Sequence, residues 1–520
     1  MSGKCRKIMY ALVVTVFAAF LWMICCENDR KVSDKAIGET TVQSMRSREK
    51  TVSLEQSDIP KIEIEDLTDA FTVILQYAPK DMLAGCTVDE SFLMWFYAQY
   101  GRDAVIHIAF DVLDGGNDPD VWYEETGNSI HVLWLLYCRD SGFGQHELEN
   151  VYWMQTAAAS EMVFGFAGDI NFAENWYTTE YMKEQPDGLR DCFSEDLLAQ
   201  MQGVDVMIMN NEFTYANKKG ATSVYGKAYT FRADPQKAEL LEIFGTDTVT
   251  LANNHVYDYG KRGFLSTLDV LDQEGIPYSG AGRNLKDASK IIYYVMNGRK
   301  VAFVSATQIE RSKQYTKAAT ETEPGVLKAL HPEKFLKIVK EAAQNSDYVI
   351  AEVHWGTEGM LYPDQSQRHL AEQIAQAGAD VIIGGHPHRL QGTTFVGDVP
   401  IAYSLGNFWF STGTLYTTLA KVTITEDGTV KLSFVPCIQQ NLTTRILTEP
   451  EEQSDFYEYL ASVSMDIGID ADGVVYNKNA DDYPAGEILY DSDTSQTDII
   501  GMADNEGDAI DIVGNLREDR

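Results

Sequence analysis

The sequence has few cysteines and no Cys-x-x-Cys pair. Cysteine occurs seven times in 520 residues, at positions 5, 25, 26, 86, 138, 192 and 437. This pattern excludes a zinc-knuckle domain and a dense disulfide framework. A chain of this length with 44% hydrophobic residues can bury an ample core without disulfides. Cys86 and Cys138 could pair in an oxidising compartment, and the alternative is that all four cysteines beyond the N-terminus are buried thiols.

The sequence is also poor in positive charge. Lys and Arg number 42 against 78 Asp and Glu, for a formal net charge of −36. No general electrostatic surface for nucleic acid is expected on such a chain, so nucleic acid is excluded as a partner. Anionic lipids and wall polymers would be repelled, except where a local basic patch or a metal intervenes. Bound cations fit this balance better.

One long uncharged run is present, at the N-terminus. Residues 8–26 contain no charged side chain and follow the basic residues Lys4, Arg6 and Lys7. We expect residues 1–26 to be a single-pass anchor in the cell membrane, with the rest of the chain on the extracytoplasmic side. The alternatives are secretion after cleavage of a signal peptide, lipidation at Cys25 or Cys26, and an ordinary buried helix.

The composition divides the remaining chain into four parts. Residues 27–60 are polar and predict a flexible linker. Residues 61–155 are apolar and aromatic and predict a small accessory domain: FTVILQYA and SFLMWFYAQYG are expected to be helical or core-buried, and SIHVLWLLYC a strand or buried helix. Residues 446–520 predict an acidic, largely disordered tail, of which the part up to about residue 465 can dock on the fold.

Between residues 160 and 445, short apolar runs alternate with helical patterns. Strands are expected at 162–168, 204–209, 248–252, 347–353 and 379–385, with helices at 263–275, 332–344 and 366–378. Asn297-Gly298 and Asp427-Gly428 predict hairpin turns. This alternation is typical of an α/β fold with a mixed sheet system.

Each of the five predicted strands ends in polar residues. In α/β sheets the carboxyl ends of the strands are where ligands bind. The side chains there offer carboxylate and amide oxygens and imidazole nitrogens, the donors that divalent metals use. They are Asp169, Asn171, Asn211, Glu212, Asn254, His255, His354, His386 and His388. His386 and His388 can chelate together, because alternate residues of an extended segment point the same way. We therefore predict a site for one or two divalent metals.

The order of these motifs resembles a known family. GD (168–169), NNEFT (210–214), LANNHVYDYG (251–260), SGAGRN (279–284), HWGTE (354–358), GGHPHRLQG (384–392) and YSLGNFWFS (403–411) are similar to motifs of the CapA family. These are bacterial capsule-synthesis proteins linked to poly-γ-glutamate, within the calcineurin-like metallophosphatase superfamily. The resemblance implies a four-layer α/β/β/α metallophosphatase-like sandwich over residues 160–445, following the accessory domain and the transmembrane anchor.

The resemblance also implies roles for individual residues. His255 would be the general acid, and the metals would be Mn, Zn, Fe or Mg. The implied metal ligands are Asp169, Glu212, Asn254, His354, His386 and His388. Two positions depart from the superfamily pattern: Asn171 stands where a histidine is usual, and Glu212 where a bridging aspartate is usual. Residues that could contact substrate, or only shape turns and the surface, are Asn171, Arg283, Glu358, Arg389 and Asn407.

The function implied is that of a membrane-anchored, extracytoplasmic metallophosphatase-like protein. It would act in the synthesis, export or anchoring of an anionic envelope polymer of the poly-γ-glutamate type, in contact with that polymer and with membrane synthase subunits. One alternative is a metal-dependent envelope hydrolase that cleaves a phosphoester or an amide. Another is a non-catalytic assembly subunit of a polymer synthase, since one site can serve many substrates.

Overall fold

The computed structural model describes residues 64, 67–80, 82–84, 86–116, 118–311 and 315–492. The predicted anchor at 1–26 and the linker at 27–60 lie outside these residues. Within the part of the chain that is described, no helix is both long and apolar enough to cross a bilayer.

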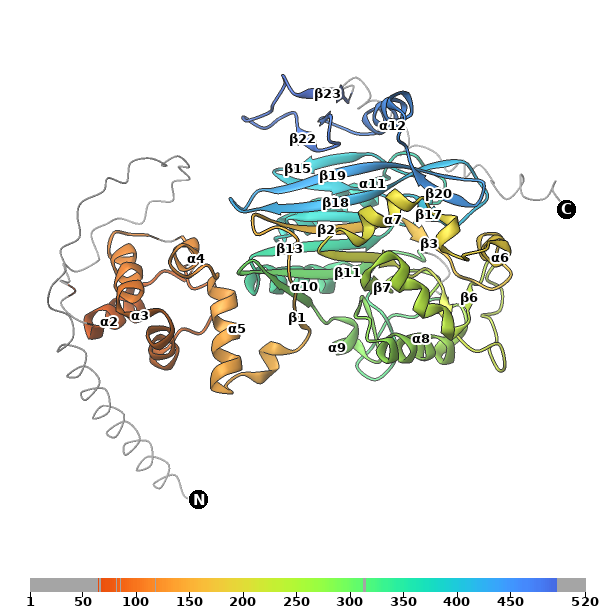
Figure 1. The fold of residues 1–520 in the computed structure, drawn as a ribbon. Coiled ribbons are helices and arrows are strands. Elements are labelled where there is room, and N and C mark those ends of the chain that lie inside the picture. The colour runs from red at the N-terminus through yellow and green to blue at the C-terminus, as the bar shows by residue number, and fades with distance from the viewer. Residues whose placement is uncertain are drawn as a thin grey trace, which may run out of the picture. The chain divides into compact units, whose positions relative to one another are not determined.

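Two seven-stranded sheets form the body of the fold (Figure 1). Both contain parallel and antiparallel pairs, so the predicted mixed α/β class is confirmed. The first sheet has the strand order β20 (Thr443–Ile446), β19 (Val430–Gln440), β18 (Leu415–Thr425), β2 (Glu161–Ala167), β4 (Val206–Asn210), β7 (Thr246–Thr250) and β8 (Tyr278–Ser279). The second has the order β1 (Val151–Trp153), β10 (Ile292–Met296), β11 (Arg299–Thr307), β13 (Tyr348–His354), β14 (Val381–Gly385), β16 (Val399–Ala402) and β15 (Thr393–Val396).

Each central strand buries both of its faces. In β4, Val206 and Ile208 join a core that also contains Phe303 and Ile350 of the second sheet. Met207 and Met209, the alternate residues of the strand, point the other way and pack beneath helices. This alternation follows from the two-residue period of a strand. The sheets therefore share one core, and each has a further core on its outer face.

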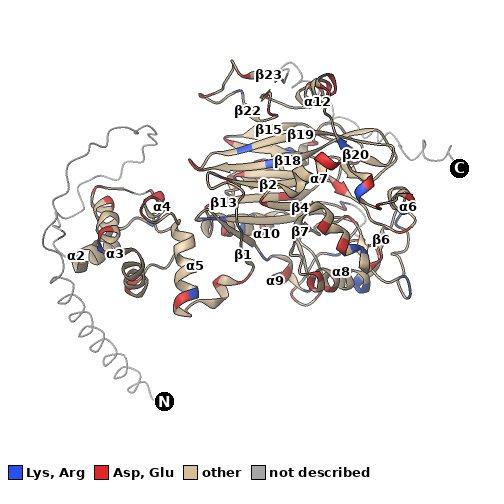
Figure 2. Ribbon diagram, viewed as in Figure 1, with Lys and Arg blue, Asp and Glu red and all other residues tan. Residues whose placement is uncertain are grey.

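Helices cover the two outer faces. On the first sheet, α8 (Gly260–Glu274) buries Phe264, Leu268 and Leu271, which recur at helical spacing, and Gly275 ends it in a left-handed conformation. On the second sheet, α10 (Glu333–Gln344) and α11 (Gln365–Gln376) pack against β11, β13 and β14. In Figure 2 α12 (Pro450–Ser462) carries acidic residues, α8 carries both signs of charge, and the central strands are mostly uncharged.

The remaining elements are shorter or lie near the ends of the described chain. The helices are α2 (Leu67–Tyr77), α3 (Glu90–Leu113), α4 (Asp120–Thr126), α5 (Ile130–Ser141), η1 (Gln145–Leu148), α6 (Tyr177–Glu184), η2 (Arg190–Cys192), α7 (Glu195–Gln202), η3 (Pro235–Phe244) and α9 (Leu285–Ala288). The strands are β3 (Asp169–Ile170), β5 (Thr214–Tyr215), β6 (Arg232–Ala233), β9 (Ala281–Gly282), β12 (Gly325–Val326), β17 (Asn407–Trp409), β21 (Ile467–Asp470), β22 (Val475–Asn477) and β23 (Ile488–Asp491).

The five predicted strands, the three predicted helices and both hairpins are confirmed. The ambiguous run SIHVLWLLYC is a helix, α5, and begins at a serine cap. Cys86 and Cys138 are free thiols, which favours the second of the two interpretations.

The prediction of a largely disordered tail is wrong for residues 467–491. They form the three-stranded sheet β22-β21-β23, which buries Ile467, Ile469 and Val475 in the core between the sheets. The acidic composition of the segment outweighed its few apolar residues in the prediction, although Ile467 and Ile469 alternate at strand spacing. Residues 493–520 lie outside the described part of the chain.

Asp347, just before β13, joins α5 to the second sheet. Its side chain is 11% exposed and accepts hydrogen bonds from Ser129 Oγ (2.6 Å), His131 Nδ1 (3.0 Å) and the Lys300 backbone N–H (2.7 Å). Burial alone would raise the pKa of this carboxyl, but the hydrogen bond and charge of His131, with the Ser129 hydroxyl, hold the pKa below its ordinary value. The ionised form is thus the one that the fold stabilises.

We expect Asp347→Ala to lower the free energy of unfolding by about 3 kcal/mol near neutral pH, because three donors lose their acceptor. The difference from wild type should shrink as the pH falls below about 4, since a carboxyl with a lowered folded pKa contributes its stability above the unfolded pKa. Urea unfolding at both pH values measures this. Asp398→Ala, at an exposed aspartate, is the matched control. An equal loss in both variants would show that the Asp347 contacts do not stabilise the fold.

Candidate metal centre

The polar strand ends of both sheets meet at one place. Strands β2, β4 and β7 run parallel in the first sheet, and β11, β13 and β14 run parallel in the second. Asp169, Glu212 and Asn254 follow the first three strands, His354 ends β13, and His386 and His388 follow β14. Since parallel strands end at the same edge of a sheet, their side chains are brought within reach of one another.

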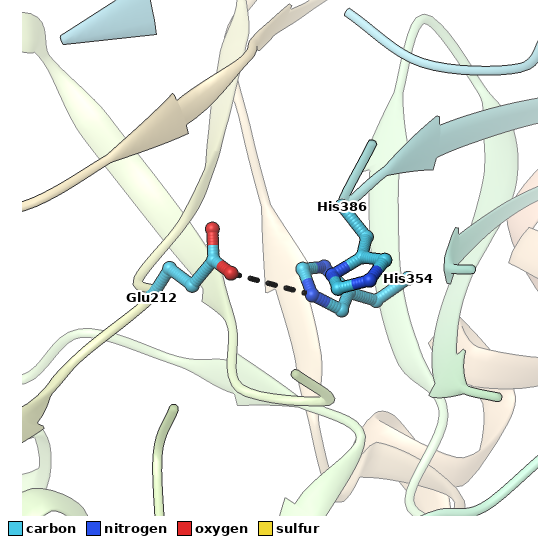
Figure 3. A group of neighbouring side chains, drawn as sticks. All are labelled: Glu212, His354 and His386. Carbon is cyan, nitrogen blue, oxygen red and sulfur yellow. Dashed lines mark ion pairs between the residues drawn. The ribbon is translucent and has the colours of Figure 1, made fainter. Parts of the chain in front are cut away.

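Glu212 is the most unusual group in this cluster. Its side chain is fully buried, and neither carboxylate oxygen has a hydrogen-bond partner. Oε1 lies 3.4 Å from His354 Nε2 and 4.0 Å from His388 Nε2, and Figure 3 shows the carboxylate facing His354. Burial, reinforced by the charge of Asp169, raises its pKa well above the ordinary value. A buried carboxylate without donors is costly unless a cation compensates it.

The histidines facing Glu212 are in the form that metals bind. Burial lowers the pKa of His354 to about 3 and that of His386 well below its ordinary value, so both rings are neutral at neutral pH. His386 Nδ1 is buried and has no hydrogen-bond partner. Neutral imidazole nitrogens are the usual ligands of divalent transition metals.

Asp169 is held in a fixed orientation beside Glu212. Its Oδ1 accepts a hydrogen bond from Asn210 Nδ2 (2.7 Å), and Oδ2 lies 3.1 Å from His388 Nδ1. Burial opposes ionisation, but His388, through its close approach and its charge, keeps the pKa of Asp169 below its ordinary value. Asp169 therefore offers a charged carboxylate whose Oδ2 is buried without a hydrogen-bond partner.

Three overlapping groups of side chains in the described residues have metal-site geometry. In each, the ligand atoms lie within 4.8 Å of one another. The groups are Glu212–His354–His386, Asp169–Glu212–His388 and Glu358–His386–His388. Orphaned buried atoms of Glu212, Asp169 and His386 lie among them, so the residues present fit a divalent metal.

Asn254 and His255 border the centre in different ways. Asn254 Oδ1 lies 2.8 Å from His354 Nε2, and its backbone oxygen accepts from Lys227 Nζ and from Thr316 Oγ1. His255 Nδ1 lies 2.7 Å from Asp258 Oδ2, which leaves Nε2 available to a substrate. Burial lowers the pKa of His255, and the charge of Asp258 opposes this.

The residues predicted to contact substrate do not all reach the centre. Glu358 does, and Asn407 does through Oδ1, 2.9 Å from His388 Nδ1. Asn171 is buried, and its Oδ1 accepts from the Ala173 backbone N–H (2.8 Å), as in a turn. The Arg283 guanidinium instead binds Asp269 and Asp272 of α8. Arg389 follows His388 in the chain, but its charge acts on the Tyr459 phenol in α12.

Two residues that support the centre were missed from the sequence. Asn210 fixes Asp169, and its own Oδ1 accepts from Asn253 Nδ2 (3.0 Å). Lys227 binds Asp258 Oδ1 (2.6 Å) and Glu310 Oε1 (3.3 Å). Asn210 is the first residue of the NNEFT motif (210–214), so its position at the strand end was a usable signal. Lys227 lies in the loop between β5 and β6, and no motif marks it.

The sequence comparisons agree with the motifs. Residues 163–412 match the family described as bacterial capsule synthesis protein PGA_cap. The chain is 34% identical over 223 residues to capsule biosynthesis protein CapA of Bacillus anthracis, covering 42% of this chain and 53% of that protein. It is 34% identical over 214 residues to PGA biosynthesis protein CapA of Bacillus subtilis, covering 40% and 55%. It thus spans about half the length of these two relatives.

The matches confirm the resemblance to CapA proteins, and the matched segment contains all the side chains of the three groups. A solved phosphatase structure from Mycoplasma pneumoniae has a TM-score of 0.34 at 13% identity, covering 58% of this chain and 99% of that one. A likeness at this level does not define the fold.

We expect Glu212→Gln to stabilise the metal-free protein by about 1–3 kcal/mol near pH 8, because it removes a buried unpaired charge. A carboxyl whose pKa is raised in the folded state makes the protein less stable as the pH rises. The gain in stability from Glu212→Gln should therefore vanish near pH ~4, where Glu212 is protonated in the folded state. Thermal unfolding of chelator-treated protein across this range measures it. Glu341→Gln, at an exposed glutamate of α10, should show no such pH-dependent gain. A destabilised Glu212→Gln would contradict the buried-charge account.

We expect Asn210→Leu to weaken Mn²⁺ binding about 10- to 100-fold, because Asp169 loses the donor that orients it. Isothermal titration calorimetry on chelator-stripped protein measures the affinity. Asn217→Leu, an exposed asparagine outside the centre, is the control. Equal Mn²⁺ affinity in both variants would mean that Asn210 does not support the metal centre.

Proposed function

We propose that this chain is a divalent-metal phosphoesterase of CapA type that acts in the synthesis, export or anchoring of a capsule polymer. One observation carries the proposal: the unpartnered Glu212 carboxylate is shared by two candidate ligand groups, and the His255–Asp258 pair lies beside them. The relatives named for capsule and PGA biosynthesis support the polymer role. The four-layer metallophosphatase-like arrangement is part of the same proposal.

The ligands fall into two sets around Glu212. One metal would be held by Glu212, His354 and His386 with the Asn254 amide oxygen, and a second by Asp169, Glu212 and His388. When bound, divalent cations at such sites polarise a phosphoryl group and activate water. Mn, Zn, Fe and Mg all accept this mixture of oxygen and nitrogen donors to differing degrees.

The chain's own contribution to the chemistry is proton transfer and orientation. His255, protonated on both ring nitrogens, would donate the Nε2 proton to the leaving oxygen and keep the Nδ1 proton in its hydrogen bond to Asp258. Asp258 holds Nδ1 at 2.7 Å and is itself fixed by Lys227 Nζ (2.6 Å) and the Phe231 backbone N–H (2.6 Å). Asp258 therefore orients the ring and favours its doubly protonated form. The Phe231 ring packs against the His255 ring, with 4.4 Å between the ring centroids.

The location and partners follow from the N-terminal sequence and the polymer role. We propose that the uncharged run at 8–26 anchors the chain in the membrane, with the metal centre on the extracytoplasmic side. There it would meet the anionic envelope polymer and membrane synthase subunits. A bound cation would offset the repulsion between this acidic chain and an anionic polymer.

We expect His255→Ala to lower kcat for an aryl phosphodiester about 10²- to 10⁴-fold while Mn²⁺ affinity is retained, because only the proton donor is lost. Turnover by Mn²⁺-loaded protein, with Mn²⁺ binding measured in parallel, tests this. His369→Ala, an exposed histidine on α11, is the matched control.

Two results would contradict the phosphoesterase. The first is wild-type inactivity on phosphoesters with each of the four metals. The second is turnover that does not depend on His255. Inactivity together with co-purification of synthase subunits would support the non-catalytic assembly role, and turnover of an amide in place of a phosphoester would support the envelope amidase.

A further inference from the structure

The solvent side of the metal centre contains a third ligand group, which shares His386 and His388 with the two groups of the proposed metal pair and adds Glu358. Glu358, His386 and His388 offer one carboxylate oxygen and two ring nitrogens within 4.8 Å of one another. Glu358 is exposed, His388 is partly buried and His386 is buried. His386 Nδ1 has no hydrogen-bond partner despite this burial. Two imidazoles and a carboxylate make a donor set that suits Mn²⁺, Fe²⁺ or Zn²⁺.

The loop that carries Glu358 is fixed beside the histidines by other residues. The Gly359 backbone N–H donates to Pro387 O at 2.8 Å, which ties this loop to the segment between the two histidines. Gln391 Nε2 donates to Met360 O and Tyr362 O, both at 3.1 Å, and Gln391 Oε1 accepts from the buried Gln367 (2.9 Å). The position of the loop therefore does not depend on the Glu358 side chain.

The neighbouring group, Asp169–Glu212–His388, has only three donors. Asn171 is near in sequence, but its oxygen is already bonded to the Ala173 N–H (2.8 Å), so it does not add a fourth. Asn407 Oδ1 lies 2.9 Å from His388 Nδ1, which leaves Nε2 of that ring free to ligate. A cation near His388 thus lacks protein ligands on its solvent side, where Glu358 lies.

We propose that Glu358 is a metal ligand, and that it completes the shell of the divalent cation that His388 binds, on the solvent side of the centre. Because Glu358 is exposed, this cation is the most weakly held and the most readily exchanged one of the centre. The inference rests on the metal centre of the proposed function, but it does not require phosphoesterase activity.

The test is a Mn²⁺ titration of the chelator-stripped full-length chain, followed by the EPR signal of free Mn²⁺. Three variants are compared with wild type. Glu358→Gln removes the charge at nearly constant shape, Glu358→Asp keeps the charge but shortens its reach, and Glu372→Gln is the matched control. Glu372 is also an exposed glutamate beside a histidine, His369, but it lies on α11 outside the centre.

We expect Glu358→Gln to weaken the weakest Mn²⁺ site about tenfold or more, Glu358→Asp to weaken it by a smaller factor, and Glu372→Gln to match wild type. The visible spectrum of bound Co²⁺ should change in Glu358→Gln, because a ligand atom is replaced. Unfolding midpoints of the metal-free variants should equal that of wild type, since the loop is held by its backbone.

Three outcomes would overturn the inference. If Glu358→Gln binds Mn²⁺ within about twofold of wild type, Glu358 is not a ligand. If Glu358→Asp binds Mn²⁺ as tightly as wild type while Glu358→Gln binds it weakly, Glu358 acts on the cation through its charge at a distance and is not a ligand. If the wild-type chain takes up no Mn²⁺ at all, the metal centre of the proposed function fails together with this inference. The first two outcomes leave that centre intact.

Discussion

The centre of this fold depends on one buried carboxylate. Glu212 is fully buried and has no hydrogen-bond donor for either oxygen. Such a group is stable in its charged form only beside a cation. The neutral rings of His354 and His386 cannot provide that charge, and they offer lone pairs to a metal instead. The ligand atoms at the other strand ends surround Glu212 in a way that suits a bound cation.

The two sheets make the cluster possible by their strand order. Parallel neighbours bring Asp169, Glu212 and Asn254 to one edge, and the second sheet brings the three histidines to the same place. The core between the sheets is apolar and contains Phe164, Phe303 and Ile350. Rigid strands on both sides keep the ligand atoms within a few ångströms without loops having to close, which favours a preformed metal site.

Much of this was predictable from the sequence, because strand and helix periods were clear between residues 160 and 445. The strands, the hairpin at Asn297-Gly298 and the grouping of polar strand ends needed only local pattern and the rule that parallel strands share an edge. Contacts between distant residues were not predictable. No spacing shows that Lys227 reaches Asp258, or that Arg283 turns away to bind α8. The folded strands at 467–491 were hidden by their acidic surroundings.

Metal binding around Glu212 by residues from both sheets is the property on which the proposed function depends. Anomalous X-ray scattering from crystals of the chain grown with Mn²⁺ tests it most directly. We expect an anomalous peak within coordination distance of Glu212, His354 and His386, and its loss in Glu212→Gln crystals. Crystals of the full-length chain with Mn²⁺ peaks only at surface carboxylates, and none at Glu212, would contradict metal binding at this centre.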